Sequence, residues 1–156
     1  MRAYRDRINN TKRILLAALV VGILDISEVV VFYGVRSGVS PIRIFQSVAS
    51  GLLGKRTFEG GAQTAILGLA LHFTIALIVV TIYHFASRRI AALRTHPIVC
   101  GALYGLCVFF VMYFVVMPLS AAGPAKFAST IILANAIFAH LFCVGIPTGL
   151  LARARR

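Results

Sequence analysis

The chain has 156 residues, 60% of them hydrophobic and 13% charged, with a mean hydropathy of +0.92. Soluble domains average about 45–50% apolar and about 25% charged residues, so this composition excludes most soluble classes, and it is too apolar for a disordered chain. Sixteen Lys and Arg face four Asp and Glu, giving a net charge of +12. These basic residues border long apolar stretches, which favours a lipid bilayer as the partner, and we expect no nucleic acid.

Four stretches are long enough to cross a membrane. A span needs about 20 mostly apolar residues, because the hydrocarbon layer is about 30 Å thick and a helix rises about 1.5 Å per residue. The stretches are 14–34, 62–84, 97–117 and 130–151. We therefore predict an all-α fold, an integral membrane four-helix bundle in which residues 1–156 form a single transmembrane domain.

A shorter helix is predicted between spans one and two, over residues 41–53. Ser40-Pro41 is a favourable helix start, with serine as the cap and proline at the first helical position, and Gly54 ends the segment. Apolar residues recur on one face. This amphipathic helix is too short to span, so we expect it to lie in the interface or to enter the bundle as a re-entrant segment.

The basic residues predict the orientation of the chain. With four spans, the N-terminal tail, the loop between spans two and three and the C-terminus share one side. Lys and Arg collect in cytoplasmic segments, so we expect both termini in the cytoplasm. Eleven basic residues lie on this side: Arg2, Arg5, Arg7, Lys12, Arg13, Arg88, Arg89, Arg94, Arg153, Arg155 and Arg156. Five lie on the other side: Arg36, Arg43, Lys55, Arg56 and Lys126.

Span one contains two acids, Asp25 and Glu28. Its thirteen Leu, Ile, Val and Phe residues favour insertion by roughly 4–8 kcal/mol in all, and two central acids oppose it by about 5–7 kcal/mol. Because the two sums nearly cancel, we expect the acids to face the bundle, to be protonated or to be paired. Their i, i+3 spacing places both on one helix face.

The predicted topology brings further polar residues to the same depth. Asp25, His72 and His140 each lie about halfway along a span, and Glu28 and Asn135 lie about one turn outward. One interpretation is that these groups only specify helix packing. Another is a centre for protons or a divalent cation, formed by Asp25, Glu28, His72 and His140 with Asn135 in support, because carboxylates and imidazoles suit proton relays and N/O metal coordination.

Two further interpretations stay open. A b-type haem between His72 and His140 would use ordinary axial ligation, but it would leave both acids unexplained. Alternatively, the chain is a structural or interaction subunit of a larger membrane complex, which it would contact through the amphipathic helix and the small-residue faces. A homodimer would suit a transport role, because four helices enclose little volume. The sequence specifies no cofactor beyond the divalent metal or haem that these residue types allow.

The remaining motifs carry little chemistry. We find no nucleophile motif, P-loop, dinucleotide fingerprint or CxxC pair, so we expect no catalytic residue and no enzyme activity. Gly101 and Gly105 form a GxxxG packing signal in span three. His84 and His96 flank the basic loop and are expected to be solvated or lipid-facing.

Several segments together resemble YagU-like proteins, small bacterial inner-membrane proteins of unknown function. The resemblance covers roughly residues 42–120 and implies a helical bundle in a bacterial inner membrane, without chemistry assigned to any residue. The segments are IFQSVASGLLG (44–54), FEGG (58–61), LGLALHF (67–73), GALYG (101–105) and PLS (118–120).

Overall fold

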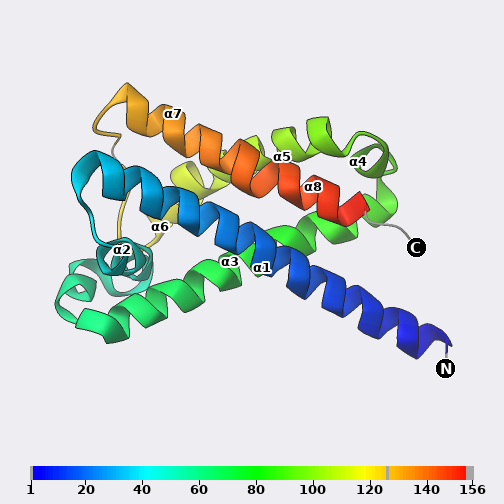
Figure 1. Cartoon of the computed structure of the whole chain (residues 1–156), viewed down its shortest axis with the longest axis horizontal. Coiled ribbons are helices and arrows are strands. Elements are labelled where there is room, and N and C mark those ends of the chain that lie inside the picture. The colour runs from blue at the N-terminus through cyan, green and yellow to red at the C-terminus, as the bar shows by residue number, and fades with distance from the viewer. Residues whose placement is uncertain (1, 126, 154–156) are drawn as a thin grey trace.

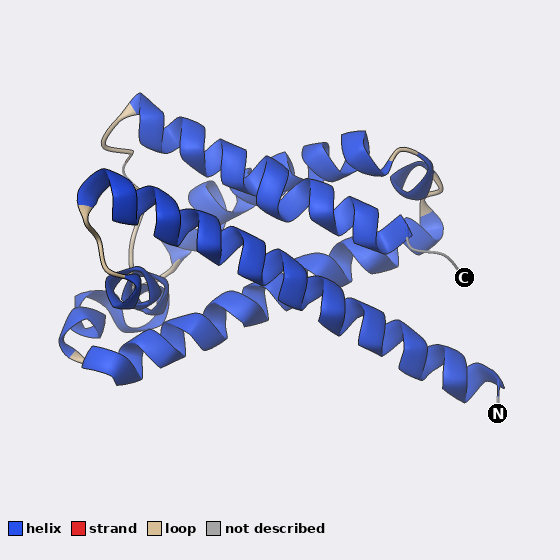
Figure 2. Ribbon diagram, viewed as in Figure 1, coloured by secondary structure: helices blue, strands red, loops and turns tan. Residues whose placement is uncertain are grey.

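The computed structural model describes residues 2–125 and 127–153, and within them the chain forms helices and loops with no strand (Figure 2). Four helical segments are long and apolar enough to cross a membrane: Asn10–Ser37, Gly61–Arg89, Pro97–Leu119 and Thr130–Arg153. The prediction of an all-helical protein with four long apolar helices is confirmed. The elements in order are α1 (Arg2–Ser37), α2 (Pro41–Leu53), η1 (Gly54–Glu59), α3 (Gly61–Arg89), α4 (Ala92–Thr95), α5 (Pro97–Val111), η2 (Met112–Val116), α6 (Met117–Leu119), α7 (Thr130–Phe138), η3 (Ala139–Gly145) and α8 (Ile146–Arg153).

The helices have two distinct ends. The start of α1, the end of α8 and the short helix α4 lie at one end, which we call the termini end (Figure 1). The helix α2 and the connection that precedes α7 lie at the opposite end, which we call the α2 end. α1 crosses α3 and also packs against η3 and α8, while α5 packs against η3 and α8.

Local sequence signals explain where α2 begins and ends. The Ser40 hydroxyl accepts a hydrogen bond from the Arg43 backbone N–H at 3.4 Å, and Pro41 occupies the first turn, where no N–H is needed. Gly54 follows with φ of 61°, a left-handed conformation that favours glycine. The segment therefore forms one short helix that turns directly into η1.

A buried hydrogen-bond network joins α2, η1 and α3. The amide of Gln46, only 3% exposed, donates to the Gly61 carbonyl at 3.0 Å and to the Thr64 hydroxyl at 3.2 Å. The Thr57 hydroxyl donates to the Gln46 carbonyl at 3.2 Å, and the Thr64 hydroxyl donates to the Thr57 carbonyl at 2.6 Å. Because these polar groups are satisfied inside the hairpin, they fix α2 against the start of α3.

Four glycines let α5 cross the last helix at backbone contact. A Cβ on Gly101 would lie 2.6 Å from the Gly145 carbonyl oxygen, and one on Gly105 would collide with the His140 carbonyl. Gly145 and Gly149 meet α5 equally closely from the other side. The GxxxG signal on α5 therefore packs against a second small-residue pair, four residues apart, in η3 and α8.

Each of the last two spans contains a π-helical turn just before a proline. η2 precedes Pro118, and η3 precedes Pro147. A proline lacks the N–H that would bond the carbonyl four residues earlier, and those carbonyls belong to Phe114 and Cys143 inside the π turns. The wider turns thus occur where the prolines interrupt the α-helical hydrogen bonds.

One cluster of buried apolar side chains lies toward the termini end, while Ile44, Ala49 and Ala65 are buried toward the α2 end. The most buried members of the cluster come from the first half of α1, the second half of α3 and from η3. They are Ile14, Ala17, Ala18, Val21, Val79, Val80 and Val144, with Ile75, Leu77, Tyr104 and Val108 packed around them.

Candidate functional site

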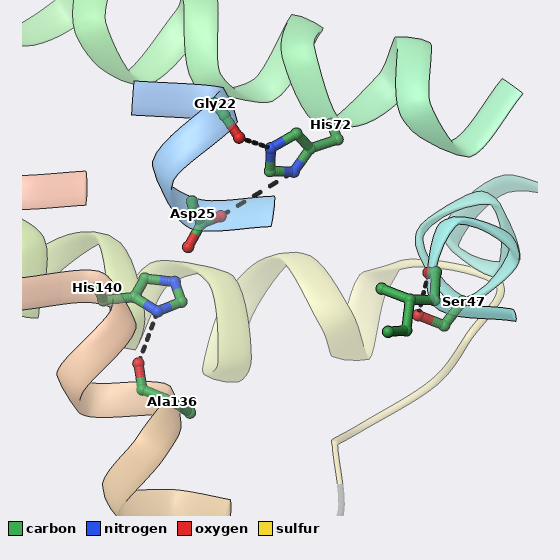
Figure 3. A network of polar contacts seen from close by, with 7 residues as sticks. Gly22, Asp25, Ser47, His72, Ala136 and His140 are labelled. Carbon is green, nitrogen blue, oxygen red and sulfur yellow. Dashed lines mark hydrogen bonds and ion pairs between the residues drawn. The ribbon is translucent and has the colours of Figure 1, made fainter. Parts of the chain in front are cut away.

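Asp25 on α1 and His72 on α3 face each other where the two helices cross. The distance from His72 Nδ1 to Asp25 Oδ2 is 4.0 Å, and their side chains are 11% and 22% exposed. The other imidazole nitrogen, Nε2, lies 2.8 Å from the Gly22 backbone carbonyl. Figure 3 shows the ring held between this carbonyl and the Asp25 carboxylate.

This arrangement fixes the tautomer of His72. A carbonyl oxygen only accepts hydrogen bonds, so Nε2 carries a proton and donates it to Gly22. In the neutral ring, Nδ1 is then the unprotonated nitrogen, and it is the one directed at Asp25. The pair can therefore exist as carboxylic acid plus neutral imidazole, or as carboxylate plus imidazolium, and the two forms differ only in which atom holds one proton.

A short movement separates this geometry from a direct hydrogen bond. Proton transfer needs a donor–acceptor distance of about 2.7–3.0 Å, and the present separation is 4.0 Å. The approach therefore requires about 1 Å of side-chain rotation, which is within ordinary rotamer motion.

Glu28 lies one turn along α1 from Asp25 and contacts α7. The Asn135 side-chain amide donates to Glu28 Oε2 at 3.4 Å. The Asp25 carboxylate lies within electrostatic range of Glu28. The two acids of span one thus have separate partners on separate helices: an imidazole for Asp25 and a carboxamide for Glu28.

His140 lies at a comparable depth, and Figure 3 shows Asp25 between His72 and His140. Its Nδ1 donates to the Ala136 carbonyl of its own helix at 2.8 Å (Figure 3). Its ring packs edge-on against Phe109 and Tyr113, with centroids 5.6 Å and 5.8 Å away. His140 lies within electrostatic range of Asp25, but within the described residues no hydrogen bond or ion pair joins them. It is therefore a neighbour of the Asp25–His72 pair.

Other titratable side chains surround the two acids. Tyr113 on η2 and Cys143 on η3 lie within electrostatic range of both carboxylates, and Tyr33 lies within range of Glu28. Tyr113 also packs against Phe127, with ring centroids 4.9 Å apart. Their place beside the acids has no signal in the sequence, because a tyrosine or cysteine in an apolar span is typical of ordinary packing or of the membrane interface.

The residues do not assemble a metal or haem site. Across residues 2–125 and 127–153, no group of three His, Cys, Asp or Glu side chains lies close enough to hold a metal ion. His72 presents one nitrogen to Gly22 and the other to Asp25, so neither is directed at a haem iron. Of the four predicted residues, Asp25 and His72 form an ion-pair contact, and Glu28 and His140 each lie within electrostatic range of Asp25.

His84 differs from the sequence expectation. It was expected in solvent or lipid, but its Nε2 lies 2.6 Å from the side-chain oxygen of Asn10. Arg13, His84 and Thr148 help to line a cavity of about 20 Å³ at the termini end, which is large enough for one water. His84 is partly exposed, and it gains this contact because the helix of span one extends toward the N-terminus and brings Asn10 beside α3.

Comparison of the chain with protein-family models, with curated proteins and with solved structures found no match. The resemblance to YagU-like proteins therefore stays a prediction.

Proposed function

We propose that this chain is a four-span membrane protein that binds and releases a proton at the Asp25–His72 pair. The observation that carries the proposal is the Nδ1 atom of His72, held 4.0 Å from Asp25 Oδ2 while Nε2 is bound to Gly22. Ionisable side chains inside membrane spans are energetically costly and are commonly functional. An imidazole can both donate and accept a proton, so this pair suits binding and releasing one.

The proposed membrane is a bacterial inner membrane, with the termini end in the cytoplasm. This orientation rests on the excess of Lys and Arg in the segments at that end. The helix α2 would then lie at the outer surface. Its buried face packs against α3, where a Cβ on Gly68 would collide with the Phe45 carbonyl. Its other face would contact lipid, because Ile42, Leu52 and Leu53 are exposed.

Infrared spectroscopy of the purified protein in lipid nanodiscs tests proton binding directly. The chain has only four Asp and Glu residues, so the C=O stretch of a protonated carboxyl group is assignable by substitution. We expect a band that titrates with pH, that disappears in Asp25→Asn, and whose midpoint moves in His72→Gln. Glu59→Gln is the matched control, because Glu59 is exposed at the end of η1, and it should leave the band unchanged.

The same variants separate proton binding from packing. If the wild-type and Asp25→Asn spectra titrate identically, the proposal is wrong and the polar groups serve the assembly of the bundle. Helicity by circular dichroism must be retained in Asp25→Asn for this comparison. Asparagine keeps the size of the side chain and its capacity to hydrogen-bond, so it is the substitution least disruptive to folding.

A further inference from the structure

The immediate surroundings of Asp25 differ between its two sides along the bundle axis. On the α2 side of Asp25 lie Glu28, Asn135 and Tyr113, all near one another. On the termini side lies the apolar core, which includes Val21, one turn before Asp25 and 1% exposed. The two sides of the same site therefore offer a proton very different environments.

The apolar layer is thick. Between Asp25 and Arg13 the helix α1 rises by about 18 Å, and its inward-facing residues there are Ile14, Ala17, Ala18 and Val21. Val80 on α3 and Val144 on η3 complete the layer. A proton does not cross such a layer without water or polar groups, because an unpaired charge in an apolar medium costs many kcal/mol.

The hydroxyl groups in this half are already bonded to backbone carbonyls. Tyr104 donates to the Val79 carbonyl at 2.8 Å, and Thr148 donates to the Val144 carbonyl at 2.6 Å. Tyr83 donates to the Leu93 carbonyl at 3.1 Å. The small cavity beside Arg13 and His84 reaches the layer, because Ile14, Ala17 and Val80 line it, but Val21 and Val144 of the layer do not, nor do Asp25 and His72. It is thus separated from the Asp25–His72 pair.

On the other side, Glu28 offers a route. It lies about 4.5 Å along the helix axis from Asp25 and on the same face, and its carboxylate is partly exposed and bound to Asn135. A carboxylate at this position can take a proton from water at the α2 end, forming an O–H bond. It can then release that proton to Asp25, and the Asp25–His72 pair can hold it on Oδ2 or on Nδ1. The titratable groups that face the two acids are His72, His140, Tyr113, Cys143 and Tyr33.

We infer that protons reach the Asp25–His72 pair only from the α2 end, with Glu28 as the relay residue and Val21, Val80 and Val144 as the seal toward the termini end. This inference rests on the proposed proton binding and adds the side from which it occurs. Asn135 is a positioning residue, because it acts by holding the Glu28 carboxylate.

Cysteine labelling in sealed vesicles tests the route without depending on proton binding. The three native cysteines, Cys100, Cys107 and Cys143, are first replaced by alanine, and circular dichroism checks that this background folds. Single cysteines are then introduced by Glu28→Cys and Val21→Cys. A charged, membrane-impermeant methanethiosulfonate is added from one side at a time. Lys55→Cys and Arg94→Cys report the orientation of the vesicles, because these residues lie at opposite ends of the bundle.

We expect Glu28→Cys to react from the α2 side about tenfold or more faster than from the termini side, because only a hydrated thiol ionises and reacts. Val21→Cys should react from neither side. Val31→Cys is the matched control: Val31 lies one turn from Glu28 but is 63% exposed on the bundle surface, where lipid should protect it. Labelling of Glu28→Cys from the termini side, or of Val21→Cys from either side, would overturn the inference.

Infrared titration tests proton binding and cysteine labelling tests the route, so one claim can be refuted while the other stands. If the infrared band of Asp25 titrates but Glu28→Cys is labelled from the termini side, proton binding stands and the route is wrong. If Glu28→Cys is labelled from the α2 side but no carboxyl band titrates, water reaches Glu28 while the proposed function is wrong. In the intact protein, Glu28→Gln should also slow the exchange of the Asp25 proton, whereas Glu59→Gln should not.

Discussion

Replacing Gly145 with alanine tests whether the crossing of α5 with the last helix holds the bundle together. A Cβ at this position would lie 2.7 Å from both Cα and N of Gly105, and it would also collide with the Gly101 carbonyl. Ordinary carbon contacts are about 3.5–4.0 Å, so the two helices must separate by about 1 Å. All three contacts are backbone atoms, which cannot turn away as a flexible side chain does.

The expected cost follows from two opposing effects. Overpacking a close contact costs about 1–3 kcal/mol, and we expect the upper end because the neighbours are backbone. Alanine in place of glycine inside a helix recovers up to about 1 kcal/mol. The Gly145→Ala variant should therefore unfold with a free energy about 2 kcal/mol below that of the wild type.

Gly51→Ala is the matched control for this experiment. Gly51 lies inside α2, and the nearest atom to a Cβ there is Ser120 Cβ at 3.9 Å. This variant should be as stable as the wild type or more stable by up to about 1 kcal/mol. The assay is reversible unfolding with SDS in mixed micelles, followed by circular dichroism. If Gly145→Ala is as stable as Gly51→Ala, the backbone crossing is not a source of stability.

Three other contacts give stability predictions in the same assay. Gln46→Leu removes the amide that joins α2 to α3 and should lower the free energy of unfolding by about 1–3 kcal/mol. Its control, Ser47→Ala, loses only a bond within its own helix and should leave that free energy nearly unchanged. Equal losses of stability in the two variants would contradict the prediction. The effects of Asn10→Ala and His84→Ala on the free energy of unfolding should differ from additivity by about 0.5–1.5 kcal/mol in a double-mutant cycle, because the two side chains are hydrogen-bonded at 2.6 Å. Strictly additive effects would refute the contact. Tyr104→Phe should lose about 1 kcal/mol with its hydroxyl bond to α3, and an unchanged free energy would show that the bond is not net stabilising.

The four long helices were predictable because they depend on apolar length, which is visible in any window of the sequence. Asp25 and His72 also follow from counting, since residues halfway along neighbouring spans must share a depth. Counting does not give rotation about the helix axis. His140 has the expected depth, but it lies in the π turn of η3, where the spacing of residues departs from 3.6 per turn. The direction of its ring therefore could not be obtained from the sequence.

Two other features of the structure could not be predicted from sequence patterns. The Gly22 carbonyl, which fixes the tautomer of His72, is a backbone group that every residue carries, so nothing in the sequence distinguishes it. The second glycine pair, Gly145 and Gly149, flanks Pro147, and proline in a span suggests a kink before it suggests close packing. Only the partner helix reveals that these glycines form a contact surface.

The two halves of the bundle differ in how easily they can open. Toward the termini end, an opening would have to pull apart backbone contacts among four glycines and expose the apolar core. Toward the α2 end, the contact beside Asp25 is between the side chains of Glu28 and Asn135, whose mutual bond is long at 3.4 Å. Moving a proton across the membrane would require opening both halves in turn, and the stiffer half opposes this. A site that exchanges protons with one side only, by switching Asp25–His72 between its two protonation forms, would need no opening at the termini end, whereas a transporter would.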